Sequence, residues 1–243
     1  MSVHLVGGGW TPEHDESVFG PFLEEATEHA VAAGRNFGPR IAIIVVRDGD
    51  GDEHAGRLAA AVGAGGLGGV FEPVVTTLAL TDLATSDAVA GVDGILIGGG
   101  LTPAYLAALS PIAAQIRQLV ADGMPYLGFS AGAMIAAERA LVGGWRIGGV
   151  EVSPEDGSEG LDEVTIEQGI GLIDVSIEVH AAQWGNLSRL IAVTEAGVID
   201  GGLAIDESTA LIVGNNAIRV TGAGSVWRVT QADGGVLVST FGA

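Results

Sequence analysis

The sequence predicts an α/β fold, a three-layer sandwich in which helices cover both faces of a mostly parallel central sheet. Over the first two-thirds of the 243 residues, short apolar runs alternate with helical patterns, and glycine-rich turns follow several of the runs. Such alternation is typical of strands that lie parallel because a helix crosses over the sheet between them. The run at 41–46 is continuous and mostly β-branched, as expected of a central strand buried on both faces.

Five strands of this sheet are predicted in chain order. They cover residues 3–6, 41–46, 71–76, 94–97 and 125–129. The predicted helices cover residues 22–33, a stretch that begins near residue 53 and includes 58–62, a stretch that begins at 110–111, and residues 131–140. Gly34 is a helix stop, and Ser110 followed by Pro111 is a helix start.

The chain changes character after residue 140. Residues 151–168 are rich in Asp and Glu and hold no Lys or Arg, which predicts a solvated loop or hairpin near the site. Short strands are predicted at 209–213, 217–220, 226–229 and 236–240, with a hairpin turn at Asp233-Gly234. We expect these strands to be antiparallel edge strands of the same sheet. Because no repeat or linker is visible, residues 1–243 are predicted to form a single domain.

Composition excludes several classes of function. The chain has no cysteine, which removes disulfides and a cysteine nucleophile, and all ten of its basic residues are arginines. Without lysine there is no Schiff-base chemistry. The net charge of −20 disfavours nucleic acid, because phosphate binding needs clustered basic side chains. No apolar run reaches the roughly 18 residues of a membrane helix, and no leader is visible, so we expect a soluble cytoplasmic protein without a membrane partner.

Ser130 lies in the pattern Gly128-x-Ser130-x-Gly132, between a predicted strand and a predicted helix. A sharp strand-to-helix turn of this kind holds the serine hydroxyl out at the end of the strand. It also directs the N–H of Ala131 at the position where an oxyanion would form. Small residues suit such a strained turn. The pattern therefore indicates acyl transfer with Ser130 as nucleophile, and its alternative is a turn whose serine merely caps the helix.

A serine nucleophile needs a base and a carboxylate that orients it. Of the five histidines only His180 follows the serine, and the apolar alternation before it predicts a strand that delivers the imidazole to a strand end. The carboxylate we favour is Glu151, which lies between Ser130 and His180. Glu138 is expected to point away from the serine, and Glu178 would need to curl back toward His180.

Glycines cluster where predicted strands end. Residues 7–9 and 98–100 are each Gly-Gly-Gly after a strand, and with Ser130 they should lie along one carboxyl edge of the sheet. Glycine backbone can approach a bound carbonyl closely, so residues 98–100 are a candidate second oxyanion donor. The alternative is a flexible turn.

No metal site is expected. Asp48, Asp50 and Asp52 have the spacing of a calcium loop, but the sixth position is Glu53 and the twelfth is Ala59. An EF-hand needs glycine and glutamate at these two positions, so we interpret the segment as an acidic loop.

Several of these segments together resemble the cyanophycinase and aspartyl dipeptidase (peptidase E) family of serine peptidases. The resemblance rests on the Gly-Phe-Ser-Ala-Gly-Ala turn at 128–133, glycines 98–100, the stretch 169–172 leading to His180, the segment 202–211 and the opening 5–9. It runs from about residue 3 to 213.

This resemblance implies a fold like that of class I glutamine amidotransferases, whose turn carries cysteine where this chain has serine. It implies Ser130 as nucleophile, His180 as base, an acid between them in sequence, and an oxyanion hole made by the N–H groups of Ala131 and Gly99. The chain departs from the family at Gly100, which the family usually replaces with a polar residue, and at residues 143–146, which lack the expected carboxylate.

Arg189 falls where the family often has an arginine. It is a candidate for holding a substrate carboxylate bidentately, and its alternative role is a surface ion pair on a helix. Gly100 and Arg189 are therefore the predicted substrate-binding residues.

The leading interpretation is a serine hydrolase of peptide or isopeptide bonds that needs no cofactor and acts on a small peptide or isopeptide. An α/β-hydrolase esterase and a catalytically degenerate, ligand-binding relative are the alternatives. Assembly into a homo-oligomer is compatible with the sequence.

Overall fold

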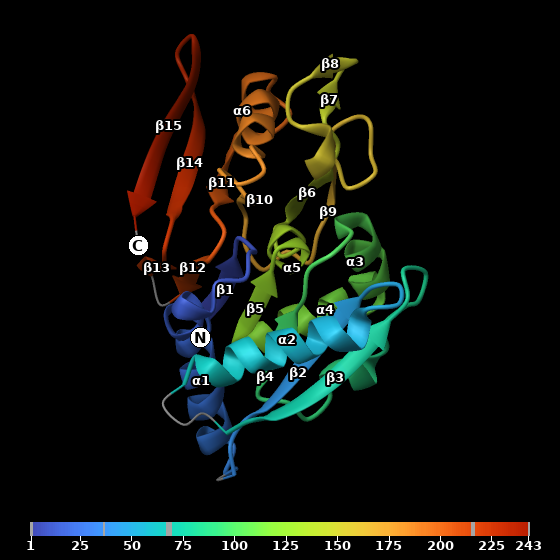
Figure 1. Cartoon of the computed structure of the whole chain (residues 1–243), viewed down its shortest axis with the longest axis vertical. Helices are drawn as coiled ribbons and strands as arrows, with labels where there is room; N and C mark the ends of the chain where they lie inside the picture. The colour runs from blue at the N-terminus through green and yellow to red at the C-terminus, as the bar shows by residue number, and fades with distance from the viewer. Residues whose placement is uncertain (1, 36, 67–69, 215–216, 243) are drawn as a thin grey trace.

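A seven-stranded sheet forms the centre of the protein, in the order β13-β12-β1-β5-β4-β2-β3 (Figure 1). The structure is a computed structural model that describes residues 2–35, 37–66, 70–214 and 217–242. The strands of this sheet are β1 (Ser2–Val6), β2 (Arg40–Val46), β3 (Glu72–Leu78), β4 (Gly94–Ile97), β5 (Tyr126–Phe129), β12 (Thr209–Gly214) and β13 (Ala217–Gly222). Strands β1 to β5 run parallel, and β12 and β13 are antiparallel additions at one edge. The predicted mostly parallel sheet is confirmed.

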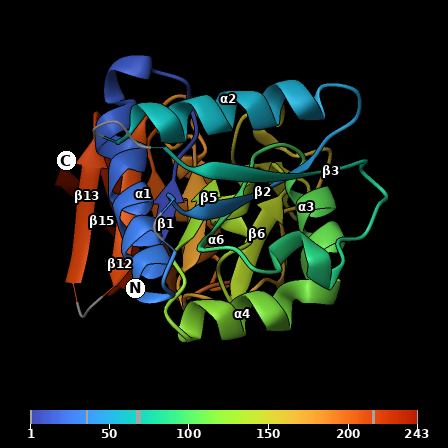
Figure 2. The same ribbon diagram turned by 90° about the horizontal axis from the view of Figure 1, so that it is seen from below.

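Helices cover both faces of the large sheet. The longer ones are α1 (Asp15–Ala32), α2 (Gly51–Ala64), α3 (Thr102–Leu109) and α4 (Ala113–Ala121); α5 (Ala131–Met134) is short, and single 3₁₀ turns occur at η1 (Pro12–His14), η2 (Ser86–Val89), η3 (Ser110–Ile112) and η4 (Glu155–Gly157). Helices α1 and α2 pack on one face, and α3, α4 and α5 pack on the other. Figure 2 shows α2 and α4 on opposite sides of the strands.

Strand β2 shows how the two cores arise from sequence. Successive side chains of a strand point to opposite faces. Ile41, Ile43 and Val45 pack under α1 and α2. The alternate residues Ala42, Ile44 and Val46 join the core on the other face. All six are fully buried. The continuous apolar run is therefore what a strand covered on both faces requires.

A second sheet has the order β10-β11-β14-β15. Its strands are β10 (Ser176–Val179), β11 (Gly201–Ile205), β14 (Ser225–Ala232) and β15 (Gly235–Gly242), and helix α6 (Leu187–Glu195) packs against it. Two short ribbons complete the fold, β6 (Arg139–Gly143) with β9 (Thr165–Gln168), and β7 (Arg146–Ile147) with β8 (Val150–Glu151). The prediction that all C-terminal strands extend one sheet was therefore half wrong. Strands β12 and β13 join the large sheet, whereas β14 and β15 join the small one.

The helix predicted over residues 131–140 was also wrong beyond its first turn. Helix α5 ends at Met134, and the chain then becomes extended. Ala137 forms a bridge with Ile173, and the N–H of Glu138 donates to the Ile173 carbonyl at 2.8 Å. Alanine favours helix only by tenths of a kcal/mol per residue, about the size that tertiary pairing routinely overrides.

Among the described residues, no helix is both long enough and apolar enough to cross a bilayer.

Candidate active site

Ser130 lies where β5 turns into α5, with φ 52° and ψ −109°. A non-glycine residue in such a conformation costs about 1–3 kcal/mol, which the surroundings must supply. Hydrogen bonds hold the turn: the Ser130 N–H donates to the Val6 carbonyl at 2.9 Å, and the Gly132 N–H donates to the Gly98 carbonyl at 3.1 Å. A β-carbon on Gly128 would lie 2.3 Å from the Gly132 carbonyl oxygen. The small residues of the pattern are therefore a steric requirement of this turn.

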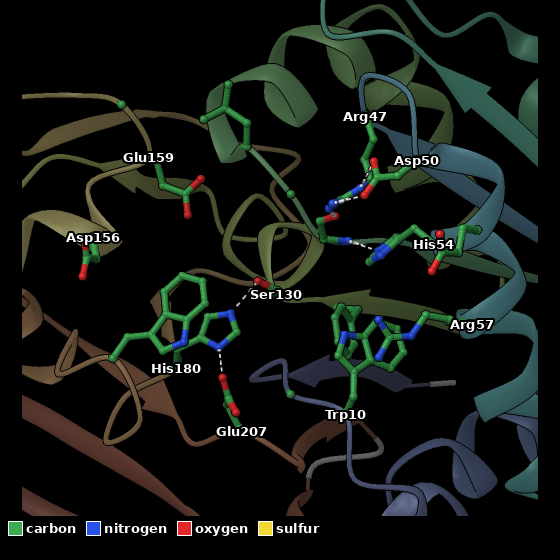
Figure 3. A pocket seen from close by; sticks show the side chains of 18 of the residues that line it. Trp10, Arg47, Asp50, His54, Arg57, Ser130, Asp156, Glu159, His180 and Glu207 are labelled. Carbon is green, nitrogen blue, oxygen red and sulfur yellow. Dashed lines mark hydrogen bonds and ion pairs between the residues drawn. The ribbon is translucent and has the colours of Figure 1, made fainter.

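His180 and Glu207 complete a chain of hydrogen bonds from the serine (Figure 3). Ser130 Oγ lies 2.9 Å from His180 Nε2, and His180 Nδ1 lies 2.7 Å from Glu207 Oε1. Because an ionised carboxylate only accepts, Nδ1 carries the ring proton of the neutral imidazole and Nε2 accepts from the serine hydroxyl. The arrangement can remove a proton from Ser130 as its oxygen attacks a carbonyl.

The environment of His180 favours a neutral ring. The side chain is buried, and this burial lowers the pKa of His180 below its ordinary value of 6.5, although Glu207 opposes the shift. The ring also stacks on the indole of Trp184, with centroids 3.9 Å apart and planes 8° apart. His180 is therefore oriented on two sides and can act as a base at neutral pH.

The glycines at 7–9 make room for this pair. A β-carbon on Gly8 would lie 2.2 Å from His180 Cε1, and one on Gly9 would lie 2.6 Å from the Glu207 β-carbon. The Gly7 carbonyl accepts from the His180 N–H at 3.0 Å. The Gly-Gly-Gly run after β1 therefore lets the backbone pass directly under the imidazole and the carboxylate.

Backbone strain gathers around the same place. Four described non-glycine residues have positive φ: Ser130, Glu159, His180 and Ser208. Three of them line one pocket and the fourth follows Glu207. Left-handed backbone at non-glycine positions is uncommon, and its concentration at one pocket marks a functional site.

The pocket in front of Ser130 has a volume of about 720 Å³. Asp156 and Glu159, from the acidic segment after β8, form one wall, and Trp10 with Arg57 forms another (Figure 3). The Glu159 carboxylate accepts from the Thr102 N–H at 2.9 Å. Burial raises the pKa of Glu159. The predicted position of the acidic segment near the site agrees with these contacts.

The two N–H groups predicted as oxyanion donors differ in their hydrogen bonds. No described residue accepts a hydrogen bond from the Ala131 N–H, which leaves it available to a ligand. The Gly99 N–H, in contrast, donates to His54 Nε2 at 3.3 Å. The assignment of Gly99 as an oxyanion donor is therefore corrected. The adjacent N–H of Gly100 has no acceptor among the described residues and lines the pocket, so it is the better candidate.

Glu151, the predicted orienting carboxylate, forms no hydrogen bond or ion pair with His180. It lies on the β7–β8 ribbon with its side chain 69% exposed, and its nearest cation is Arg146 at 3.6 Å. The carboxylate that contacts His180 Nδ1 is instead that of Glu207, on the turn between β11 and β12.

The prediction placed the orienting carboxylate before His180 in sequence, whereas Glu207 follows His180. One signal was present. The segment 202–211 carries the family resemblance and contains Glu207, at the end of a buried strand.

Arg189 does not face the pocket. Its guanidinium is 1% exposed and forms a two-bond ion pair with Glu178, at 2.7 and 2.9 Å. It also donates to the carbonyls of Gly144 and Gly157. Burial alone would lower the pKa of Arg189, but Glu178 raises it. A guanidinium with these partners cannot bind substrate, so its role is to tie the acidic segment to β10.

Metal ligation has no candidate among the residues that the structure describes, since no three His, Asp or Glu side chains are grouped to hold an ion. Within the apparent calcium loop, Asp50 pairs with Arg47, and Asp52 accepts from the Thr77 hydroxyl.

A protein-family model matches more than half of the chain. The model of peptidase family S51 matches residues 74–221. Among curated proteins, the PurQ subunit of phosphoribosylformylglycinamidine synthase from Halobacterium salinarum is 41% identical over 61 residues, which are 23% of this chain and 27% of that subunit. The chain thus aligns with about a quarter of the length of this relative.

Two solved structures share the fold. A peptidase from an acI-B1 Actinobacterium has a TM-score of 0.59 at 19% identity, over 100% of this chain and 96% of that one. A candidate peptidase E protein from Listeria monocytogenes EGD-e has a TM-score of 0.55 at 16% identity, over 92% of this chain and 98% of that one.

The buried ion pair generates a stability prediction. Glu178→Gln leaves the Arg189 charge buried without a counter-charge, and it should lower the free energy of unfolding by about 3–5 kcal/mol. Urea denaturation measures the loss. The same change at the exposed pair, Glu151→Gln, is the matched control and should cost less than about 1 kcal/mol. Equal losses in the two variants would contradict a structural role for Arg189.

Proposed function

Because the chain belongs to peptidase family S51, we propose that it is a serine peptidase that cleaves peptide or isopeptide bonds through an acyl-enzyme on Ser130. The observation that carries the proposal is the hydrogen-bonded series Ser130–His180–Glu207, with contacts of 2.9 and 2.7 Å. It has the geometry of a nucleophile, a base and an orienting carboxylate.

In the proposed first step, Ser130 Oγ attacks the carbonyl carbon of the scissile bond and its proton passes to His180 Nε2. The carbonyl oxygen becomes an oxyanion, which the N–H groups of Ala131 and Gly100 stabilise. Glu207 stays ionised and stabilises the imidazolium. When the C–N bond breaks, the proton moves from His180 to the leaving amine and the acyl group remains as an ester on Ser130.

In the second step, water attacks the ester carbonyl and gives its proton to His180. A second tetrahedral intermediate collapses, the acid product leaves, and the proton returns from His180 to Ser130 Oγ. The same base and the same oxyanion donors therefore serve both steps, and the chemistry requires no other group.

A class I glutamine amidotransferase-like fold is part of the proposal. The large parallel sheet, with the nucleophile turn at the end of its central strand β5, supports it. Serine in place of cysteine at that turn, in a chain without cysteine, supports hydrolysis of peptides over transfer of ammonia.

Neither alternative function has an observation in its favour. An α/β-hydrolase places its residues in the order Ser, acid, His, whereas here the acid Glu207 follows His180. The degenerate, ligand-binding interpretation rests on the lack of a carboxylate at residues 143–146, and the contact of Glu207 with His180 supports the hydrolase instead.

Labelling tests the nucleophile. A fluorophosphonate probe should label the wild-type protein, and Ser130→Ala should abolish both labelling and hydrolysis of a panel of dipeptides and isoaspartyl dipeptides. Intact-mass spectrometry measures the adduct. Persistent labelling of the Ser130→Ala variant would refute the assignment, and a folded wild-type protein that never labels would favour the ligand-binding alternative.

Paired variants test the acid. Glu207→Gln should lower kcat/KM by about 10²–10⁴, because an amide no longer fixes the tautomer of His180 or stabilises its charge. Glu151→Gln makes the identical chemical change on the exposed ribbon and should leave kcat/KM within about twofold of wild type. A larger loss at residue 151 than at residue 207 would restore the original assignment.

The pH dependence tests the base. Neutral His180 is the reactive form, and because its pKa is lowered, activity should persist below pH 6.5 before it falls. The acid limb of log kcat/KM against pH reports this group in the free enzyme. In Glu207→Gln the limb should move to still lower pH, since the carboxylate is what raises the pKa. A midpoint at or above 6.5, or a shift to higher pH in the variant, would argue against His180.

A further inference from the structure

His54 is a second histidine in the pocket, and the proposed reaction leaves it without a role. It comes from the first turns of α2, is 9% exposed, and lies edge-on to Trp10 and to Phe129, the residue before the nucleophile. A buried, titratable ring beside a nucleophile is seldom there for packing alone, because an apolar residue would pack as well without desolvation cost.

The hydrogen bond of His54 fixes its protonation. The Gly99 N–H donates to His54 Nε2 at 3.3 Å, so Nε2 must carry no proton. Burial, together with the nearby Arg47 and Arg57, lowers the pKa of His54 to about 4, and Asp50 opposes this shift. At neutral pH the ring is therefore an uncharged acceptor for a backbone donor.

The other side of Gly99 is held as firmly. Its carbonyl accepts from the Tyr105 hydroxyl at 3.0 Å and from Arg47 Nη1 at 3.0 Å. Tyr105 is fully buried, which raises the pKa of its phenol to about 12, so it remains a donor. Gly99 thus has both of its backbone polar groups bound, one by His54 and the other by Tyr105 and Arg47.

This clamp determines where the next N–H points. In a trans peptide the carbonyl of one residue and the N–H of the next point in opposite directions. Because the Gly99 carbonyl faces Tyr105 and Arg47, the Gly100 N–H faces away from them. Gly99 itself lies against the nucleophile, since a β-carbon there would be 3.0 Å from the Ser130 β-carbon.

We propose that His54 and Tyr105 are positioning residues, which clamp Gly99 so that the Gly100 N–H is held as a donor to the oxyanion formed at Ser130. The proposal rests on the proposed function. Three successive glycines have many accessible backbone conformations, and without a clamp the peptide would leave the donating orientation for much of the time. An interaction made only with the oxyanion lowers the barrier of the chemical step and leaves substrate binding unchanged.

Two substitutions at one position isolate the acceptor. His54→Phe keeps an aromatic ring against Trp10 and Phe129 but removes the acceptor, and kcat should fall about 10- to 100-fold with KM within about twofold. His54→Gln can place an amide oxygen near the position of Nε2, so it should recover most of the wild-type kcat. Thermal unfolding establishes that both variants fold.

Tyr105→Phe provides an independent arm, because it removes a donor to the Gly99 carbonyl and leaves His54 in place. Its kcat should also fall with little change in KM. Since both residues act on the same backbone unit, the double variant His54→Phe/Tyr105→Phe should lose less activity than the product of the two single losses.

The rate of fluorophosphonate labelling is a second readout, since the phosphoryl oxygen of the adduct occupies the oxyanion position. This rate should fall in His54→Phe in parallel with kcat. A folded His54→Phe variant with wild-type kcat, or a Gln variant as slow as the Phe variant, would overturn the clamp. The Ser130→Ala variant separates failure of the clamp from failure of the proposed function. If Ser130→Ala abolishes activity while either of these His54 results is obtained, the clamp is wrong and the proposed function stands.

Discussion

The close packing of residues 7–9 against the loops that carry His180 and Glu207 is the constraint on which the site depends. Ser130 ends a strand of the large sheet, whereas His180 ends β10 of the small sheet. Glu207 lies where the chain passes from β11 to β12, that is, from one sheet to the other. The site is therefore assembled across a junction, and the glycines allow the two sheets to approach within hydrogen-bonding distance. A β-carbon on Gly7 would lie 2.2 Å from the Asp206 carbonyl oxygen, so the junction has no room for larger residues.

Much of the large sheet could be predicted from the sequence, because its signals are local. The pattern that predicts each feature lies within about ten residues. This holds for the buried run at 41–46, the glycine-rich strand ends and the turn around Ser130. Pairing between strands that are distant in sequence leaves no such pattern in the neighbouring residues. The alanines after Met134 look helical, yet the chain there is extended because it pairs with the segment around Ile173. In the same way, β14 pairs with β11, from which β12 and β13 separate it in sequence, and not with β13, the strand just before it.

The site shows the same division. Ser130 and His180 could be proposed from a motif and from elimination, and the structure brings them together. Glu207 could not be identified as the partner of His180 from its neighbouring residues, since any carboxylate after a strand has the same local pattern. It reaches His180 because the chain crosses there from β11 to β12. The prediction that Arg189 binds substrate failed for a related reason. A sequence does not reveal whether an arginine faces a cavity or a buried glutamate, and here Arg189 on α6 faces Glu178 on β10.

The stack of Trp184 on His180 has a consequence for the charge that appears during turnover. In the proposed reaction the imidazole becomes a cation while it lies flat on the indole, whose π-electron face attracts positive charge. With centroids 3.9 Å apart, the cation–π attraction adds about 0.5–2 kcal/mol to the stacking once the proton has moved. The uncharged indole therefore attracts the imidazolium more strongly than it attracts the neutral ring, and this difference lowers a part of the barrier without a second carboxylate.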